Sequence, residues 1–187
     1  MTNLRQPDVV TIAVTRVDGG LTILRVITAE YRPTTDAEQS AGLGDRLVTN
    51  THDPTPAYIT ALIAKHGWTG GQQMVSWRFV PNDFVDDTTD RTFRNAWKDD
   101  GGITPGTDMP TARDIHRDRL RAIREPLLLA LDADYLRALE TNDVLEQRRI
   151  AAKKQALRDV TADPAIDAAQ TPEALKLVMP AALVSTP

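Results

Sequence analysis

Apolar, mostly β-branched residues dominate residues 9–14 and again residues 21–27, on either side of a short polar segment. That segment contains the pair Asp18-Gly19, which tolerates the positive φ of a tight turn between antiparallel strands. The two apolar runs and the turn between them therefore predict a β-hairpin near the start of the chain.

The next segment has no hydrophobic periodicity, and the residues after it predict a helix and then a strand. Arg32–Pro54 is rich in Thr, Gly, Asp and Pro, and we expect it to form a long loop. Thr55 followed by Pro56 is typical of a helix start, because a hydroxyl caps the helix and proline fits its first position. We expect this helix to end near Gly67, and the alternation in Gln73–Val80 predicts a third strand.

A change of pattern divides the chain into two parts. Thr92–Trp97 is expected to form a last short strand before a turn-rich boundary at Lys98–Met109. Beyond that boundary there is no glycine, tryptophan or phenylalanine, and apolar residues recur every three or four positions. We therefore predict an α+β fold, with a small hairpin/helix/strand head over residues 1–98 and a helical region over residues 109–187.

We expect the helical region to form a helical hairpin. Thr111–Leu139 predicts a long helix with a kink, or a break into two helices, at Pro126, because proline removes a backbone hydrogen bond. Asn142 and Asp143 predict a turn with a built-in cap, and a second helix follows to about residue 160. A further short helix is expected to start at Thr171. The side of the second helix that we expect to be buried consists of Leu145, Ile150, Ala152, Ala156, Leu157 and Val160.

Composition excludes several function classes. The chain of 187 residues has no cysteine, which excludes disulfides, zinc fingers, iron–sulfur clusters and thiol nucleophiles. Its longest apolar run, Leu127–Leu131, is far shorter than the ~18 residues that a membrane span needs, so we expect no membrane partner. Residues 1–15 lack the basic start and apolar stretch of a signal peptide, so nothing predicts secretion.

Candidate catalytic and metal-binding residues are sparse. The three histidines, His52, His66 and His116, lack the spacing of a helical zinc site, and we expect His116 to lie on a solvated helix face. The acidic segment Asp83–Asp90 lacks the order of a calcium-binding loop, and Gly67–Gly71 precedes a strand instead of opening a helix. We therefore expect no catalytic residue, no metal and no cofactor. A small metal-dependent hydrolase that uses His52, His66 or His116 stays as a less favoured alternative.

Arginines near the start of the long helix form the main basic feature of the chain. Asp114 and Asp118 lie three residues before Arg117 and Arg121, a spacing at which side chains on a helix pair. The chain as a whole carries a net charge of −4, whereas nucleic-acid binding favours a basic domain with a continuous basic face. We therefore expect a solvated face with salt bridges and no nucleic-acid partner.

Leucines cover more of the circumference of the long helix than one neighbouring helix buries. Two interpretations stay open: either the head covers the excess as part of a core, or another protein covers it. Trp97 is likewise either a core residue of the head or an interface anchor. Under the partner hypothesis, the residues that contact the other protein are Leu128, Leu129, Leu136, Leu139, Trp97, Arg117 and Arg121.

Three segments together carry a resemblance to a known family: Arg91–Trp97, Ala112–Arg119 and Lys154–Thr161. In this order they resemble proteins of tailed bacteriophages and prophages. The last segment, with its Leu-Arg-Asp sequence, resembles the core of the phage tail assembly chaperone family. The resemblance covers about residues 91–180, and Val178–Pro180 stands where the family has a terminal Trp-Pro.

The resemblance implies a non-enzymatic protein that acts at the phage tail. In one version it is a permanent virion component, a structural or adaptor protein at the tail or tail fibre. In the other it is a transient chaperone of tail or tail-fibre assembly that is missing from the mature virion. Both versions imply other tail or tail-fibre proteins as partners in an oligomeric assembly, and synthesis in the cytoplasm of the bacterial host. The first version further implies a location in the tail of the virion.

Overall fold

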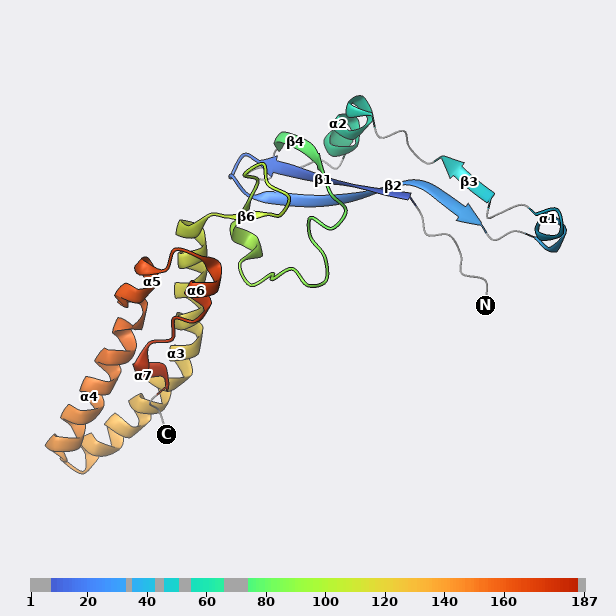
Figure 1. Ribbon diagram of the computed structural model, residues 1–187. Helices are drawn as coiled ribbons and strands as arrows, with labels where there is room; N and C mark the ends of the chain where they lie inside the picture. The colour runs from blue at the N-terminus through green and yellow to red at the C-terminus, as the bar shows by residue number, and fades with distance from the viewer. Residues whose placement is uncertain (1–7, 33–34, 43–45, 51–54, 66–73, 185–187) are drawn as a thin grey trace. The chain divides into compact units, whose positions relative to one another are not determined.

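The computed structural model describes residues 8–32, 35–42, 46–50, 55–65 and 74–184. The fold is α+β, and the chain divides into two compact units, Met1–Gly106 and Thr107–Pro187 (Figure 1). The first unit is built on a β-sheet. The second, called the helical unit below, is built on two long helices.

A four-stranded antiparallel sheet forms the framework of the first unit. Its strands are β1 (Asp8–Arg16), β2 (Leu21–Arg32), β3 (Arg46–Asn50) and β4 (Met74–Val80), in the order β3-β2-β1-β4. β1 and β2 form the predicted hairpin, and Gly19 in its turn has a φ of 78°, which favours glycine. The predicted third strand is also confirmed, since β4 pairs with β1 along the edge that β2 leaves free.

The helix α2 (Pro56–Lys65) covers one face of this sheet. It begins at the predicted cap, where the Thr55 hydroxyl accepts a hydrogen bond from the Tyr58 N–H at 3.3 Å. The predicted end near Gly67 lies outside the described residues. Ile59 and Ile63 of α2 are buried against a core cluster that also contains Ile12, Val14 and Val26.

The opposite face of the sheet has its own core cluster, because successive side chains of a strand point to opposite faces. Ala13 lies between Ile12 and Val14 in the sequence and packs on this second face with Leu21, Val80, Phe84 and Val85. Phe84 and Val85 come from the turn-rich segment after β4, so this segment covers the second face. Both faces of β1 are therefore buried.

Two short elements interrupt the segment that we expected to be a long loop. Helix α1 (Asp36–Ser40) begins with a reciprocal cap, in which Thr35 and Glu38 each accept a hydrogen bond from the backbone of the other. Strand β3 pairs with the end of β2 from Ala29 to Arg32. The prediction of a loop throughout Arg32–Pro54 is therefore wrong, because a local cap and a strand edge order residues that show no hydrophobic periodicity.

The prediction of a strand at Thr92–Trp97 is wrong for most of these residues. Residues Arg94–Ala96 form a short 3₁₀ helix, η2, because Phe93 and Ala96 are both buried and their three-residue spacing suits such a turn. Only the last residue belongs to a strand, β5 (Trp97–Lys98), which pairs with β6 (Gly106–Thr107).

Two antiparallel helices, α3 (Met109–Glu140) and α4 (Val144–Asp159), form the predicted helical hairpin. The turn between them contains Asn142, whose φ is 54°, and the predicted cap Asp143, which accepts a hydrogen bond from the Glu146 N–H at 3.0 Å. α3 runs continuously through Pro126, so the alternative that the helix breaks into two at this residue is wrong. Pro126 lies on the exposed side, and the packed side of α3 is uninterrupted.

Short helical segments complete the helical unit. They are the 3₁₀ helix η3 (Val160–Ala162), α5 (Pro164–Ala168), α6 (Pro172–Lys176) and α7 (Ala181–Val184). The predicted cap Thr171 starts α6, whereas α5 and α7 were not expected. α5 follows the cap Asp163, and its residue Ile166 is fully buried, so tertiary packing stabilises a helix too short to be seen in the hydrophobic pattern.

Replacing Asp143 with alanine is expected to lower the free energy of unfolding of the helical unit by ~1 kcal/mol, because the first turn of α4 loses its cap. Thermal denaturation followed by far-UV circular dichroism measures this change. Asp134→Ala is the matched control, since it removes an exposed carboxylate within α3 that pairs with Arg137 and caps no helix. An equal loss in both variants would contradict the capping role.

Candidate partner-binding surface

The leucines assigned to a partner lie on different sides of α3. Leu129, Leu136 and Leu139 are 64%, 58% and 53% exposed. Leu128 is half-buried and packs against the core cluster of the helical unit, which contains Leu131, Ala138, Ile150 and Leu157. The structure therefore separates three leucines that face solvent from one that supports the fold.

Exposed uncharged residues form a continuous line along α3, here called the α3 stripe. Their spacing alternates between four and three residues, so they share one face of the helix. The face opposite to the stripe carries the buried residues Leu120, Leu131 and Ala138. The stripe consists of Ala122, Pro126, Leu129, Ala133 and Leu136. α3 is thus apolar on two opposite faces, of which only one is covered within the helical unit.

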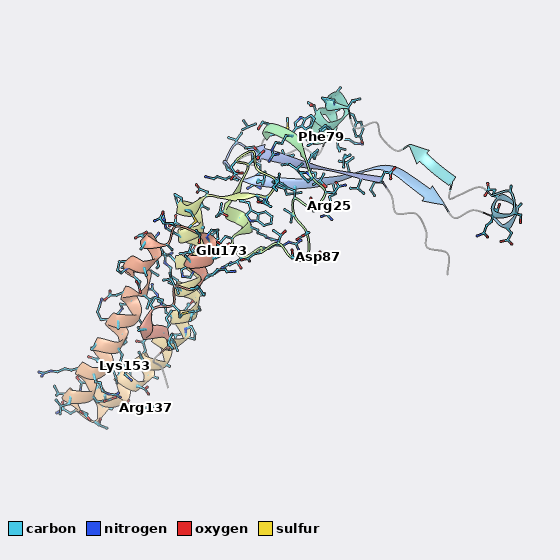
Figure 2. The ribbon with its side chains drawn as sticks, in the orientation of Figure 1. Arg25, Phe79, Asp87, Arg137, Lys153 and Glu173 are labelled. Atoms are coloured by element: carbon cyan, nitrogen blue, oxygen red, sulfur yellow. The ribbon has the colours of Figure 1, made fainter. Side chains whose placement is uncertain are left out.

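Charged residues flank the stripe without interrupting it. Helical geometry places Asp132 along one edge of the stripe and Arg137 along the other. Asp132 pairs with Lys154 of α4, and Arg137 pairs with Asp134 at 2.9 Å. Figure 2 shows Arg137 near the turn between α3 and α4. A partner that covers the stripe can therefore leave these ion pairs intact at its rim.

The turn end of the hairpin adds further exposed apolar residues. Leu145, in the first turn of α4, is 79% exposed, and Val144 beside it is also exposed. Leu139 lies at the other side of the same turn, at the end of α3. The expectation that Leu145, Ala152 and Ala156 are buried is wrong, because the buried residues of α4 are Ile150 and Leu157, followed by Val160 at the start of η3.

Arg117 and Arg121 form the ion pairs that their spacing predicts. Arg121 pairs with Asp118, and Arg117 pairs with Asp114 at 3.1 Å. Arg117 also pairs with Asp167 of α5 at 2.6 Å, and this hydrogen bond raises its pKa above the ordinary value. Arg117 therefore connects α5 to α3, and neither arginine belongs to the α3 stripe.

Trp97 belongs to the first unit and not to the surface described above. Its half-buried ring packs against the second core cluster of the sheet, together with Ile23. The other described tryptophan, Trp77, donates from its Nε1 to the Thr60 hydroxyl at 3.3 Å. Trp77 also meets Phe79 edge-to-face, with ring centroids 5.4 Å apart, and Figure 2 labels Phe79 on β4.

His116 is buried, so the expectation of a solvated face is wrong at this position. Its Nε2 atom lies 3.0 Å from the Val178 carbonyl oxygen, because the segment after α6 covers this part of α3. A carbonyl only accepts, so Nε2 must donate a hydrogen here. Burial lowers the pKa of His116 below its ordinary value; the bond to Val178 opposes this shift, and the charge of Arg119 adds to it.

As the pH decreases from about 6.5 to the lowered pKa of His116, the helical unit is expected to become less stable. In this window the unfolded chain binds a proton that the folded protein excludes, so the stability is fully present above pH 6.5 and is lost as the pH decreases. Urea denaturation at pH 7.5 and pH 5.5 measures the loss. His116→Gln keeps a donor for Val178 without titrating and should lose less; equal losses would contradict this account.

The structure describes one of the three histidines on which the metal-dependent hydrolase hypothesis rests. His52 and His66 lie outside the described residues, and His116 is engaged with a backbone carbonyl. Within the ranges that the structure describes, there is no group of three or more histidines and carboxylates that could hold a metal ion. In the acidic segment, the Asp86 carboxylate accepts hydrogen bonds from Thr88 and Thr89, which lower its pKa.

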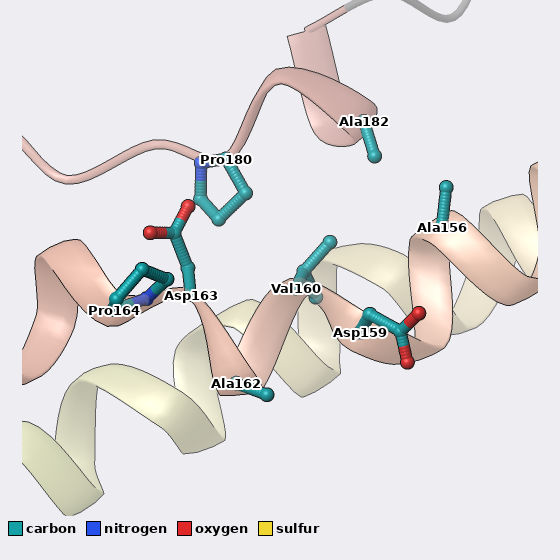
Figure 3. A pocket seen from close by; sticks show the side chains of 8 residues that line it. All are labelled: Ala156, Asp159, Val160, Ala162, Asp163, Pro164, Pro180 and Ala182. Carbon is teal, nitrogen blue, oxygen red and sulfur yellow. The ribbon is translucent and has the colours of Figure 1, made fainter.

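An open pocket of about 330 Å³ lies in the helical unit, where α4 and η3 meet the segment after α6 (Figure 3). Its two carboxylates point in different directions in Figure 3. Asp159 accepts a hydrogen bond from Gln155 at 2.8 Å, and Asp163 accepts one from the Ala165 N–H at 2.9 Å. Because both carboxylates have structural partners and the rest of the lining is alanine, proline and valine, the pocket lacks the convergent polar groups of an active site.

No protein-family model, no curated protein and no solved structure matches this chain. In the part of the chain that the structure describes, no helix is both long enough and apolar enough to cross a membrane.

Proposed function

We propose that the protein is a non-enzymatic component of a bacteriophage tail, which joins other tail or tail-fibre proteins through the α3 stripe. The observation that carries this proposal is an exposed, uncharged helix face that lies directly opposite the buried face of the same helix. The phage setting comes from the resemblance of residues 91–180 to tail assembly proteins.

The physical argument for a partner is the free energy that its binding releases. Burying a leucine side chain away from water stabilises a complex by about 1.5–3 kcal/mol, and Leu129 and Leu136 of the stripe are each more than half exposed. A line of apolar residues with a period near 3.5 is the pattern by which one helix packs against another. The stripe therefore suits a helix or an apolar groove of the partner.

The permanent and the transient versions of this role differ in what happens after assembly. A structural or adaptor protein keeps its stripe covered in the virion, whereas an assembly chaperone releases its client and exposes the stripe again. We favour the structural version because the stripe is apolar without charged interruptions, which makes long-lasting exposure to water unfavourable.

Quantitative mass spectrometry of purified virions tests this function. The proposal predicts that the chain is present at a fixed ratio to the other tail proteins. Its absence from virions, together with its presence in lysates of infected cells, would contradict the structural version and leave the assembly chaperone.

A further inference from the structure

A second pocket, of about 410 Å³, lies within the first unit, beside the turn of the β1–β2 hairpin. It belongs to a different unit from the α3 stripe, and the proposed partner binding does not use it. Its size lies within the range of pockets that hold small organic ligands. The residues that line it are Arg16, Leu21, Thr22, Ile23, Val85, Arg91, Arg94, Asn95 and Trp97.

Part of the pocket wall is apolar and continuous with the second core cluster of the sheet. Leu21 and Val85 are buried members of that cluster, and Ile23 packs against it. Trp97 adds a half-buried indole ring that also lines the pocket. Such a wall suits a planar or apolar group of a ligand, because an indole stacks well on another ring.

Three arginines from two distant parts of the chain line the same pocket. Arg16 is oriented by the Asp18 carboxylate at 3.0 Å and by the Thr22 hydroxyl at 3.1 Å. Arg91 donates one hydrogen bond to the Asp86 carbonyl oxygen at 3.2 Å. Among the described residues, the Arg94 guanidinium has no hydrogen-bond or ion-pair partner.

Gly20 makes room for one of these guanidinium groups. A Cβ atom at this position would overlap the Nη2 atom of Arg16, so the absence of a side chain allows the guanidinium to lie over the turn. The backbone of Gly20 does not have a positive φ, unlike that of Gly19. An alanine at Gly20 is therefore compatible with the turn but displaces the Arg16 side chain.

The charged residues that line the pocket favour an anionic ligand. Three arginines and no acidic residue line the pocket, and one of these arginines, Arg16, pairs with Asp18. A phosphate monoester carries a charge of about −1.5 to −2 near pH 7, and one guanidinium group can donate two parallel hydrogen bonds to its oxygens. Asn95 and Thr22 add uncharged groups that can hydrogen-bond to the rest of a ligand.

We propose that this pocket binds a small phosphate monoester that carries a planar ring, of the size of a nucleoside monophosphate. The arginines hold the phosphate, with Arg94 as the group that gains its first partner on binding. The ring lies against Trp97 and the apolar wall. This activity is independent of the α3 stripe, so loss of either function leaves the other intact.

Isothermal titration of the full chain with adenosine 5′-monophosphate tests the proposal. We expect a Kd on the order of 10–100 µM at low ionic strength, with weaker binding at higher salt because the attraction is largely electrostatic. Adenosine lacks the phosphate and inorganic phosphate lacks the ring, so each should bind at least tenfold more weakly. No binding of the monophosphate at millimolar concentration would overturn the proposal, and inorganic phosphate binding equally well would overturn the assignment of a ring.

Two variants distinguish specific binding in this pocket from non-specific electrostatic attraction of the ligand to the protein. Arg94→Gln and Gly20→Ala should each weaken binding about tenfold or more, although Gly20→Ala leaves the net charge unchanged. Lys65→Gln is the matched control, since it removes a positive charge from α2, which covers the other face of the sheet. An equal loss in Lys65→Gln, or no loss in Gly20→Ala with retained circular dichroism, would overturn the proposed geometry.

Discussion

Replacing Leu157 with alanine is expected to lower the free energy of unfolding of the helical unit by about 2–5 kcal/mol. Leu157 is 3% exposed and lies in the core cluster that joins α4 to α3. Removing its side chain reduces the buried apolar area and leaves a cavity between α3 and α4. The two helices cannot close this cavity without shifting relative to each other. Leu129→Ala, in contrast, should change stability by less than ~0.5 kcal/mol, because Leu129 is 64% exposed.

Urea denaturation followed by far-UV circular dichroism measures both changes, since helices dominate the signal at 222 nm. Trp68, Trp77 and Trp97 all belong to the first unit, so tryptophan fluorescence in the same titration follows that unit separately. The first unit serves as the internal control and should keep its transition in both variants. Equal destabilisation by Leu157→Ala and Leu129→Ala would contradict the assignment of buried and exposed faces on α3.

The double substitution Leu129→Glu with Leu136→Glu is expected to weaken binding to the tail partner by at least about 100-fold. Each leucine loses about 1.5–3 kcal/mol of apolar burial, and each glutamate brings a charge that the interface must desolvate. The fold should persist, because both positions are more than half exposed. Co-purification of the full chain with tail proteins from infected cells, followed by titration of the isolated partner, measures the loss.

The control for this experiment adds the same two charges elsewhere on the helical unit. Ala151→Glu with Ala165→Glu places them at exposed positions of α4 and α5, away from the stripe, and should bind normally. Leu128 is unsuitable for such a test, because it is half-buried and its substitution would affect fold and binding together. Unchanged binding by the stripe variant would contradict the proposed surface.

Elements with strong local signals could be predicted from the sequence. The β1–β2 hairpin follows from two apolar runs around Asp18-Gly19, and the starts of α2, α4 and α6 follow from capping residues. These signals act within a few residues and do not depend on the rest of the fold. The same local rule predicted a kink or a break at Pro126; the break is wrong, because α3 continues through this residue.

The missed elements depend on contacts between distant segments. β3 exists because β2 extends far enough to offer it an edge, and α5 is stabilised by burial of Ile166. His116 lies among arginines in the sequence, and its contact with the carbonyl of Val178 comes from a segment about sixty residues further along the chain. No pattern within either segment encodes these contacts.

The candidate binding surfaces also depend on contacts between distant segments, so the sequence predicts them only in part. The sequence identified an excess of leucines on the long helix, but neighbouring residues Leu128 and Leu129 differ in exposure according to which face α4 and the C-terminal segments cover. The arginine pocket unites Arg16 with Arg91 and Arg94, which the hairpin and η2 bring together from positions far apart in the chain. Such convergence is a property of the tertiary structure.

Hydroxyl-radical footprinting of the protein, free and in purified virions, tests the central claim most directly. Leu129 and Leu136 should be oxidised in the free protein and strongly protected in virions, because a neighbouring tail protein covers the α3 stripe. Leu177, which is 83% exposed and lies outside the stripe, provides the reference for general accessibility. Equal oxidation of Leu129 and Leu136 in the two states, with the protein present in the virion, would contradict the proposed role of the stripe.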